Sequence, residues 1–208
     1  MKSIAVCVFL MISSIGMAQN KYEQGMERAF QLWDADQSVE AANLFERIAQ
    51  AELDNWLPAF YVAQINILNS FNEKDEATLT DQLQKAKMFI DRAKEIEGEH
   101  PELLVLEAQM YTAWVVFDGQ KYGMSYSPKI AQLYSKAQTL APNNPRVVLG
   151  KAEWDMGSAR FFGKPITPYC AEIERAIELF TSFEPESKFH PDGGAKHAEE
   201  LLARTCNN

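Results

Sequence analysis

Residues 130–145 read IAQLYSKAQTLAPNNP, and this stretch decides the fold. Ile130, Tyr134 and Ala137 follow one another at intervals of four and three residues, which places them on one face of an α-helix. Pro142 comes five residues later and predicts the end of the helix, because proline lacks an amide hydrogen and its ring clashes with the preceding turn. The stretch therefore predicts an amphipathic helix with a defined end.

The same spacing occurs earlier in the chain. Ala86, Ile90 and Ala93 repeat the intervals of four and three residues, and Gly98 takes the position of Pro142. No alternating run rich in Val, Ile or Thr predicts a strand. A helix with one apolar stripe cannot bury that stripe alone, so we expect antiparallel helix pairs and an all-α fold.

The apolar periodicity predicts about four helix pairs and a closing helix. The expected helices cover approximately residues 22–33, 39–49, 58–68, 83–97, 101–114, 130–142, 145–154, 168–180 and 194–205. Between two of them we expect a long loop over Asp118–Ser127, with Ser127 and Pro128 at the start of the next helix, because Pro is favoured in a first turn.

This pattern resembles the tetratricopeptide repeat. Leu104, Ala108 and Tyr111 match the first helix of that repeat, and the residues spaced by four, three and five match its second helix. The resemblance implies a stack of helix hairpins in which the first helix of each pair lines an inner face. The loops inside the later units are longer than the family's tight turn, so we expect a compact, irregular stack with a C-terminal capping helix.

The amino-terminal residues predict an export signal. Lys2 precedes an apolar run over residues 4–15, and small residues follow up to Ala18. This layout is typical of a secretory signal peptide, so we expect residues 1–18 to be removed and residues 19–208 to form a single domain in the periplasm or outside the cell. The run is shorter than the ~20 apolar residues of a membrane span, and we expect no integral membrane segment in the mature chain.

The carboxyl-terminal part resembles exported repeat proteins of Bacteroidetes-type bacteria. The residues that carry the resemblance are Asn144-Pro145-Arg146, the aromatic-glycine loop at Phe162-Gly163, Glu184-Pro185-Glu186, His190-Pro191 and Cys206. This resemblance implies the compartment and the helical fold, and it implies no particular activity.

Charge and motifs exclude several classes of function. Against 20 Lys and Arg the chain has 29 Asp and Glu, a net charge of −9, which repels phosphate backbones and argues against a nucleic-acid partner. No phosphate-binding loop, zinc-protease motif or nucleophile motif is present. His100 and His190 each precede a proline, which indicates turns, and the spacing of His190, Asp192, His197 and Glu200 matches no established set of metal ligands. We therefore expect no catalytic residues, no cofactor and no metal site.

The repeat register predicts which side chains face the inner surface. They are Tyr61, Ile65, Val105, Gln109, Thr112, Arg146, Leu149 and Glu153. A mixed apolar and polar face suits an extended peptide or a partner helix, so we predict a protein–protein interaction module or adaptor in the cell envelope. Three alternatives stay open: a groove filled by the chain's own loops, a carrier of a small apolar molecule in an enclosed pocket, and an enzyme with an unrecognised site.

Two cysteines remain once the predicted signal peptide is removed. Cys170 begins one expected helix and Cys206 ends the closing helix, and antiparallel packing would bring these two ends together. A disulfide requires Cα atoms within ~7 Å and persists in an oxidising compartment. A Cys170–Cys206 disulfide and two separate thiols both stay open at this point.

Overall fold

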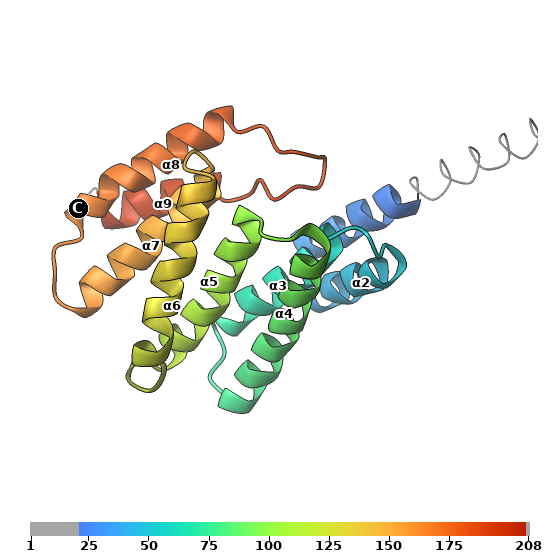
Figure 1. Ribbon diagram of the computed structural model, residues 1–208, viewed down its shortest axis with the longest axis horizontal. Helices are drawn as coiled ribbons and strands as arrows, with labels where there is room; N and C mark the ends of the chain where they lie inside the picture. The colour runs from blue at the N-terminus through green and yellow to red at the C-terminus, as the bar shows by residue number, and fades with distance from the viewer. Residues whose placement is uncertain (1–20, 207–208) are drawn as a thin grey trace, which may run out of the picture.

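A computed structural model describes residues 21–206, which contain helices and no strand (Figure 1). The all-α prediction is confirmed, whereas the predicted signal peptide lies outside the described residues. The elements are a first helix over residues 21–34, α2 (Ser38–Ala51), α3 (Leu57–Ser70), α4 (Glu76–Glu97), α5 (Pro101–Phe117), α6 (Gly119–Leu140), α7 (Pro145–Phe161), the 3₁₀ turn η1 (Thr167–Tyr169), α8 (Cys170–Ser182) and α9 (Ala195–Thr205). Among the described helices, none has both the length and the apolar character to cross a membrane.

Helices that follow one another in the chain pack as hairpins. α3 packs against α4, α5 against α6 and α7 against α8, while α9 packs against α8 and closes the stack. α5 also contacts both α3 and α7, so these three helices form one inner row. The inner row positions the site, because its helices are the first members of three consecutive hairpins.

The start of α6 differs from the predicted Asp118–Ser127 loop, because these residues are helical from Gly119 onward. One oxygen of the Asp118 carboxylate accepts hydrogen bonds from the backbone N–H groups of Gln120 (3.0 Å) and Lys121 (2.9 Å). A cap of this kind satisfies amides that otherwise lack partners at a helix start. The prediction of a loop here is wrong because Asp118 caps a helix that begins nearly three turns before Pro128.

Aromatic packing holds these added turns of α6 against α5. The ring of Trp114 on α5 lies 4.8 Å from the ring of Tyr122 and 6.4 Å from that of Tyr126, measured between centroids. Pro128 is therefore inside α6, where it removes one backbone hydrogen bond without ending the helix. The long α6 extends beside the inner row and supplies part of its border.

The connection between α8 and α9, residues 183–194, returns across the molecule to the first helix (Figure 1). Phe189 on this connection packs edge-on against Tyr22, with centroids 5.6 Å apart, and stacks on Phe30 at 6.0 Å. The Tyr61 hydroxyl donates a 2.8 Å hydrogen bond to the carbonyl of Phe189, and burial raises the pKa of Tyr61. The connection is therefore fixed to both α3 and the first helix.

Helices α6 and α7 approach closely at Gly150. A Cβ atom at Gly150 would lie 2.9 Å from Cε1 of Tyr134, which is itself buried and cannot move aside freely. Gly157, two turns later on α7, has no atom within 4 Å of such a position. The two glycines therefore differ in packing although they lie on the same helix.

We predict opposite effects on stability from the same substitution at these two positions. Gly150→Ala should lower the free energy of unfolding by about 1–3 kcal/mol, because it overpacks the α6–α7 contact. Gly157→Ala should raise it by about 0.5–1 kcal/mol, because alanine loses less backbone entropy in a helix. Chemical denaturation measures both, and equal effects at the two positions would contradict the packing described.

Cys170 and Cys206 form a disulfide, with Cα atoms 5.9 Å apart and 36 residues of sequence separation. It joins the start of α8 to the end of α9 and encloses the connection between them. Around it, α7, α8 and α9 share an apolar cluster that includes Ile173 and Leu201.

Loss of this disulfide should destabilise the carboxyl-terminal end of the stack. We expect the double variant Cys170→Ser, Cys206→Ser to lose about 2–4 kcal/mol, because the unfolded chain regains the freedom of a long loop. Thermal unfolding with and without reductant tests this, with the double variant as the control that reductant should not affect. A parent protein whose unfolding is insensitive to reductant would refute the prediction.

Candidate functional site

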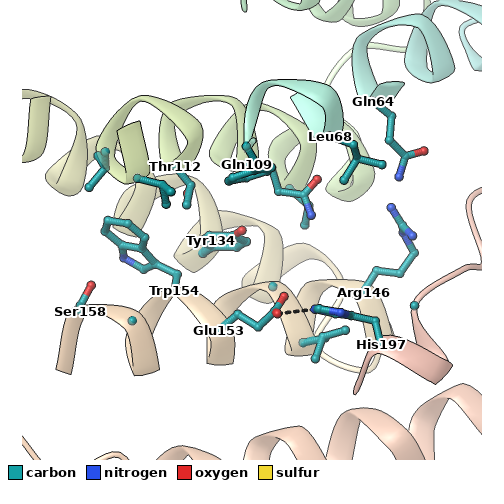
Figure 2. A pocket seen from close by; sticks show the side chains of 18 of the residues that line it. Gln64, Leu68, Gln109, Thr112, Tyr134, Arg146, Glu153, Trp154, Ser158 and His197 are labelled. Carbon is teal, nitrogen blue, oxygen red and sulfur yellow. Dashed lines mark hydrogen bonds and ion pairs between the residues drawn. The ribbon is translucent and has the colours of Figure 1, made fainter. Parts of the chain in front are cut away.

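A cavity of about 1770 Å³ borders the inner row of helices. α3 and α5 provide one wall and α7 the opposite wall, so that Gln109 and Thr112 face Glu153 and Trp154 across it (Figure 2). The first turns of α6 border one end, and residues 191–194 with the start of α9 border another. Pockets for drug-sized ligands hold about 300–1,000 Å³, so this cavity has room for a larger molecule.

Seven of the eight side chains predicted for the inner face line this cavity. They are Tyr61, Val105, Gln109, Thr112, Arg146, Leu149 and Glu153. Ile65 does not line it and is buried in the core instead. On α3 the cavity is lined by Tyr61, Gln64 and Leu68, whereas Ile65, at the edge of the same helix face, is turned into the core.

Other lining residues were not expected from the sequence. Gly123 and Met124 lie on the part of α6 that was predicted to be a loop, so their placement followed from the Asp118 cap. Residues 191–194 and His197 come from the far end of the chain, and no local pattern indicates that they return to α3 and α5. Leu68 offered one signal, because it lies seven residues after Tyr61 and therefore shares its helix face.

Exposed apolar side chains gather at this cavity. Among residues 21–206, nine large apolar side chains are well exposed, and five of these line the cavity: Leu68, Val116, Met124, Phe161 and Phe162. Met124 is 93% exposed, and Phe161 and Phe162 are each 70% exposed. Large apolar residues concentrated around a hollow mark a site for an apolar ligand, because scattered exposure would have no such focus.

One end of the cavity is polar and rigidly held around Arg146. Its Nε donates a 2.7 Å hydrogen bond to the carboxylate of Glu102, which is fully buried on α5. The side-chain amide of Asn144 donates to the other oxygen of the same carboxylate at 2.7 Å. Nη1 of Arg146 donates to the carbonyl of Gly193 at 2.6 Å. The guanidinium thus joins α5, α7 and the 183–194 connection at the cavity.

A second polar group at this end is the pair formed by His197 and Glu153. Nε2 of His197 on α9 lies 2.6 Å from Oε1 of Glu153 on α7, as the dashed line in Figure 2 marks. The hydrogen bond to Glu153 is the largest cause that raises the pKa of His197. The pair holds α9 to α7 beside the cavity.

The His197–Glu153 pair should depend on pH. Because the pKa of His197 is raised on folding, the pair contributes its full stabilisation below about pH 6.5, and this is lost as pH rises through the raised pKa. We expect Glu153→Gln to return the pKa of His197 toward its ordinary value in an NMR titration. Glu199→Gln, an equal charge change on the exposed surface of α9, is the control, and an unchanged pKa in Glu153→Gln would contradict the pairing.

Comparison with solved structures finds a similar fold in the HusA haemophore from Porphyromonas gingivalis. The TM-score is 0.75 at 22% sequence identity, and the match covers 88% of this chain and 94% of that chain. No protein-family model and no curated protein matches the sequence. The similarity establishes a shared fold with a protein from a Bacteroidetes bacterium, while the resemblance to the tetratricopeptide repeat stays a prediction.

This finding corrects the function predicted from the sequence. We predicted a protein–protein interaction module or adaptor whose inner face binds a protein or peptide, and that prediction is wrong. The structural neighbour is a haemophore, and the inner row borders a large, mostly apolar cavity.

Proposed function

We propose that this protein is a carrier that binds a large, planar, apolar molecule of the tetrapyrrole class, such as haem, in the cavity beside α3, α5 and α7. The observation that carries the proposal is an apolar cavity of about 1770 Å³ with a fixed cationic group at one end. The shared fold with a haemophore supports the same ligand class.

The chemistry of a tetrapyrrole matches the two parts of the cavity. Its ring is broad and apolar, and it suits walls that include Trp154, Phe161 and Val105. Its carboxylate side chains lie along one edge and need a cationic partner. The hydrogen bonds of Arg146 to Glu102 and Gly193 use two of the five N–H donors of an arginine, and the others suit a ligand carboxylate.

A carrier requires binding and release without turnover, and we propose a non-enzymatic role for this chain. The ionisable groups at the polar end are already engaged with one another, Arg146 with Glu102 and His197 with Glu153. Such pairs fix the shape of a binding site. We further propose that the protein acts after export, in keeping with the predicted signal peptide.

Haemin should bind with saturation, and a side chain that fills the cavity should weaken the binding. Gly157 lines the cavity, and a Cβ atom there would meet no atom within 4 Å, so Gly157→Trp introduces a large ring at the cavity wall. We expect at least a tenfold loss of haemin affinity, measured by absorbance titration of the Soret band. Gln132→Trp, at an exposed position of α6 outside the lining, should leave the affinity within twofold.

The carboxylates of the ligand provide a second test that leaves the protein unchanged. Protoporphyrin IX should bind more tightly than its dimethyl ester, because only the acid can pair with Arg146, and quenching of tryptophan fluorescence measures both. Absence of saturable haemin binding, or equal binding by the parent and Gly157→Trp, would refute the proposed function.

A further inference from the structure

Two histidines and a glutamate meet outside the cavity, at the amino-terminal end of α5. His100 precedes α5, whereas Glu186 and His190 lie on the connection over residues 183–194. Nε2 of His100 lies 3.6 Å from Oε1 of Glu186, and Nδ1 of His190 lies 4.0 Å from Oε2 of the same carboxylate. One potential ligand atom from each residue lies within 4.8 Å of the others.

We infer that His100, Glu186 and His190 form a binding site for a divalent transition-metal ion of the zinc class. Two imidazole nitrogens and one carboxylate oxygen are a ligand set that zinc takes in proteins, with a water molecule in the fourth position. Ligand bonds of about 2.1 Å in a tetrahedral site place donor atoms about 3.4 Å apart. The described spacings are wider by up to about 1.4 Å, a difference that the exposed Glu186 side chain and a small turn of the His100 ring must close when a metal binds.

The surroundings orient both imidazole rings. His190 is buried, with its ring 5.5 Å from that of His100, and the ring of Trp56 lies 4.9 Å from His100 and 5.8 Å from His190. The hydrogen bond between the Tyr61 hydroxyl and the carbonyl of Phe189 fixes the residue next to His190. Ligands held in this way lose little freedom when a metal binds, which favours binding.

Coordination of a metal through Nε2 of His100 would replace the hydrogen bond that Nδ1 of the same ring accepts. In the metal-free protein, Nδ1 of His100 accepts a hydrogen bond from the backbone N–H of Glu102 at 3.2 Å, a long distance for such a bond. A metal ion on Nε2 places the ring proton on Nδ1, so this bond is given up. The hydrogen bond that is lost is a weak one, and the bond from Nε2 of His100 to the metal compensates for it.

A metal bound at this site would hold more than its three ligands in place, because it would join the 183–194 connection to the start of α5. Gly193 on the same connection accepts a hydrogen bond from Arg146 at the cavity. Metal binding therefore stabilises a segment that borders the cavity. The inference goes beyond the proposed carrier function and does not depend on it.

Isothermal titration of the untagged mature protein with zinc chloride tests the site. We expect one zinc ion per chain, and at least a tenfold weaker affinity in Glu186→Gln. Glu184→Gln makes the same charge change two residues away on the exposed connection and should leave the affinity within twofold. His100→Asn removes the imidazole while keeping a side chain that caps helices well, and it should also weaken binding tenfold.

Two further measurements keep the result independent of folding defects and of the cavity. At the same zinc concentration, the thermal unfolding midpoint should rise more in the parent than in Glu186→Gln. His197→Asn, which changes a cavity histidine, should bind zinc like the parent. Absence of zinc binding by the parent, or equal affinity in Glu186→Gln and the parent, overturns the inference. Either result leaves the haemin titration, which tests the proposed function, unaffected.

Discussion

The buried carboxylate of Glu102 is the constraint on which the rest of the site depends. A fully buried charge is tolerated only when hydrogen bonds and an opposite charge compensate it, and Arg146 and Asn144 supply these. Removing one partner of such a buried pair typically costs about 3–5 kcal/mol. The need to satisfy Glu102 therefore fixes the start of α7 against the start of α5, and the same guanidinium fixes Gly193.

Away from this polar end, the cavity is bordered by apolar side chains that remain exposed to solvent. The inner row buries its small and branched residues between helices, yet Met124, Phe161 and Phe162 remain in contact with solvent at the border. A protein that exposes aromatic rings around a hollow gains by covering them, and a flat apolar ligand supplies that cover. The proposed carrier function thus follows from the position of this exposed apolar surface around the cavity.

The sequence predicted the helices and their pairing because these depend on local periodicity, as in the stretch from Ile130 to Pro142. Most of the side chains predicted for the inner face, those on α5 and α7 among them, line the cavity. The sequence placed Ile65 wrongly, because the register of α3 is set by packing, and it missed the helical residues after Asp118, whose cap overrides Pro128. The return of residues 183–194 to α3 and α5 rests on contacts between distant parts of the chain, such as Tyr61 with Phe189, which leave no local pattern.

The disulfide between Cys170 and Cys206 has a consequence for proteolysis. Residues 184–188 are exposed and lie outside any helix, which makes this part of the connection accessible to proteases. A cut there divides the chain, but the disulfide keeps the fragment with α9 covalently attached to α8. The fragment stays at its own docking surface at a high effective concentration, so a nicked molecule retains α9 beside α7 and α8 for as long as its surroundings remain oxidising.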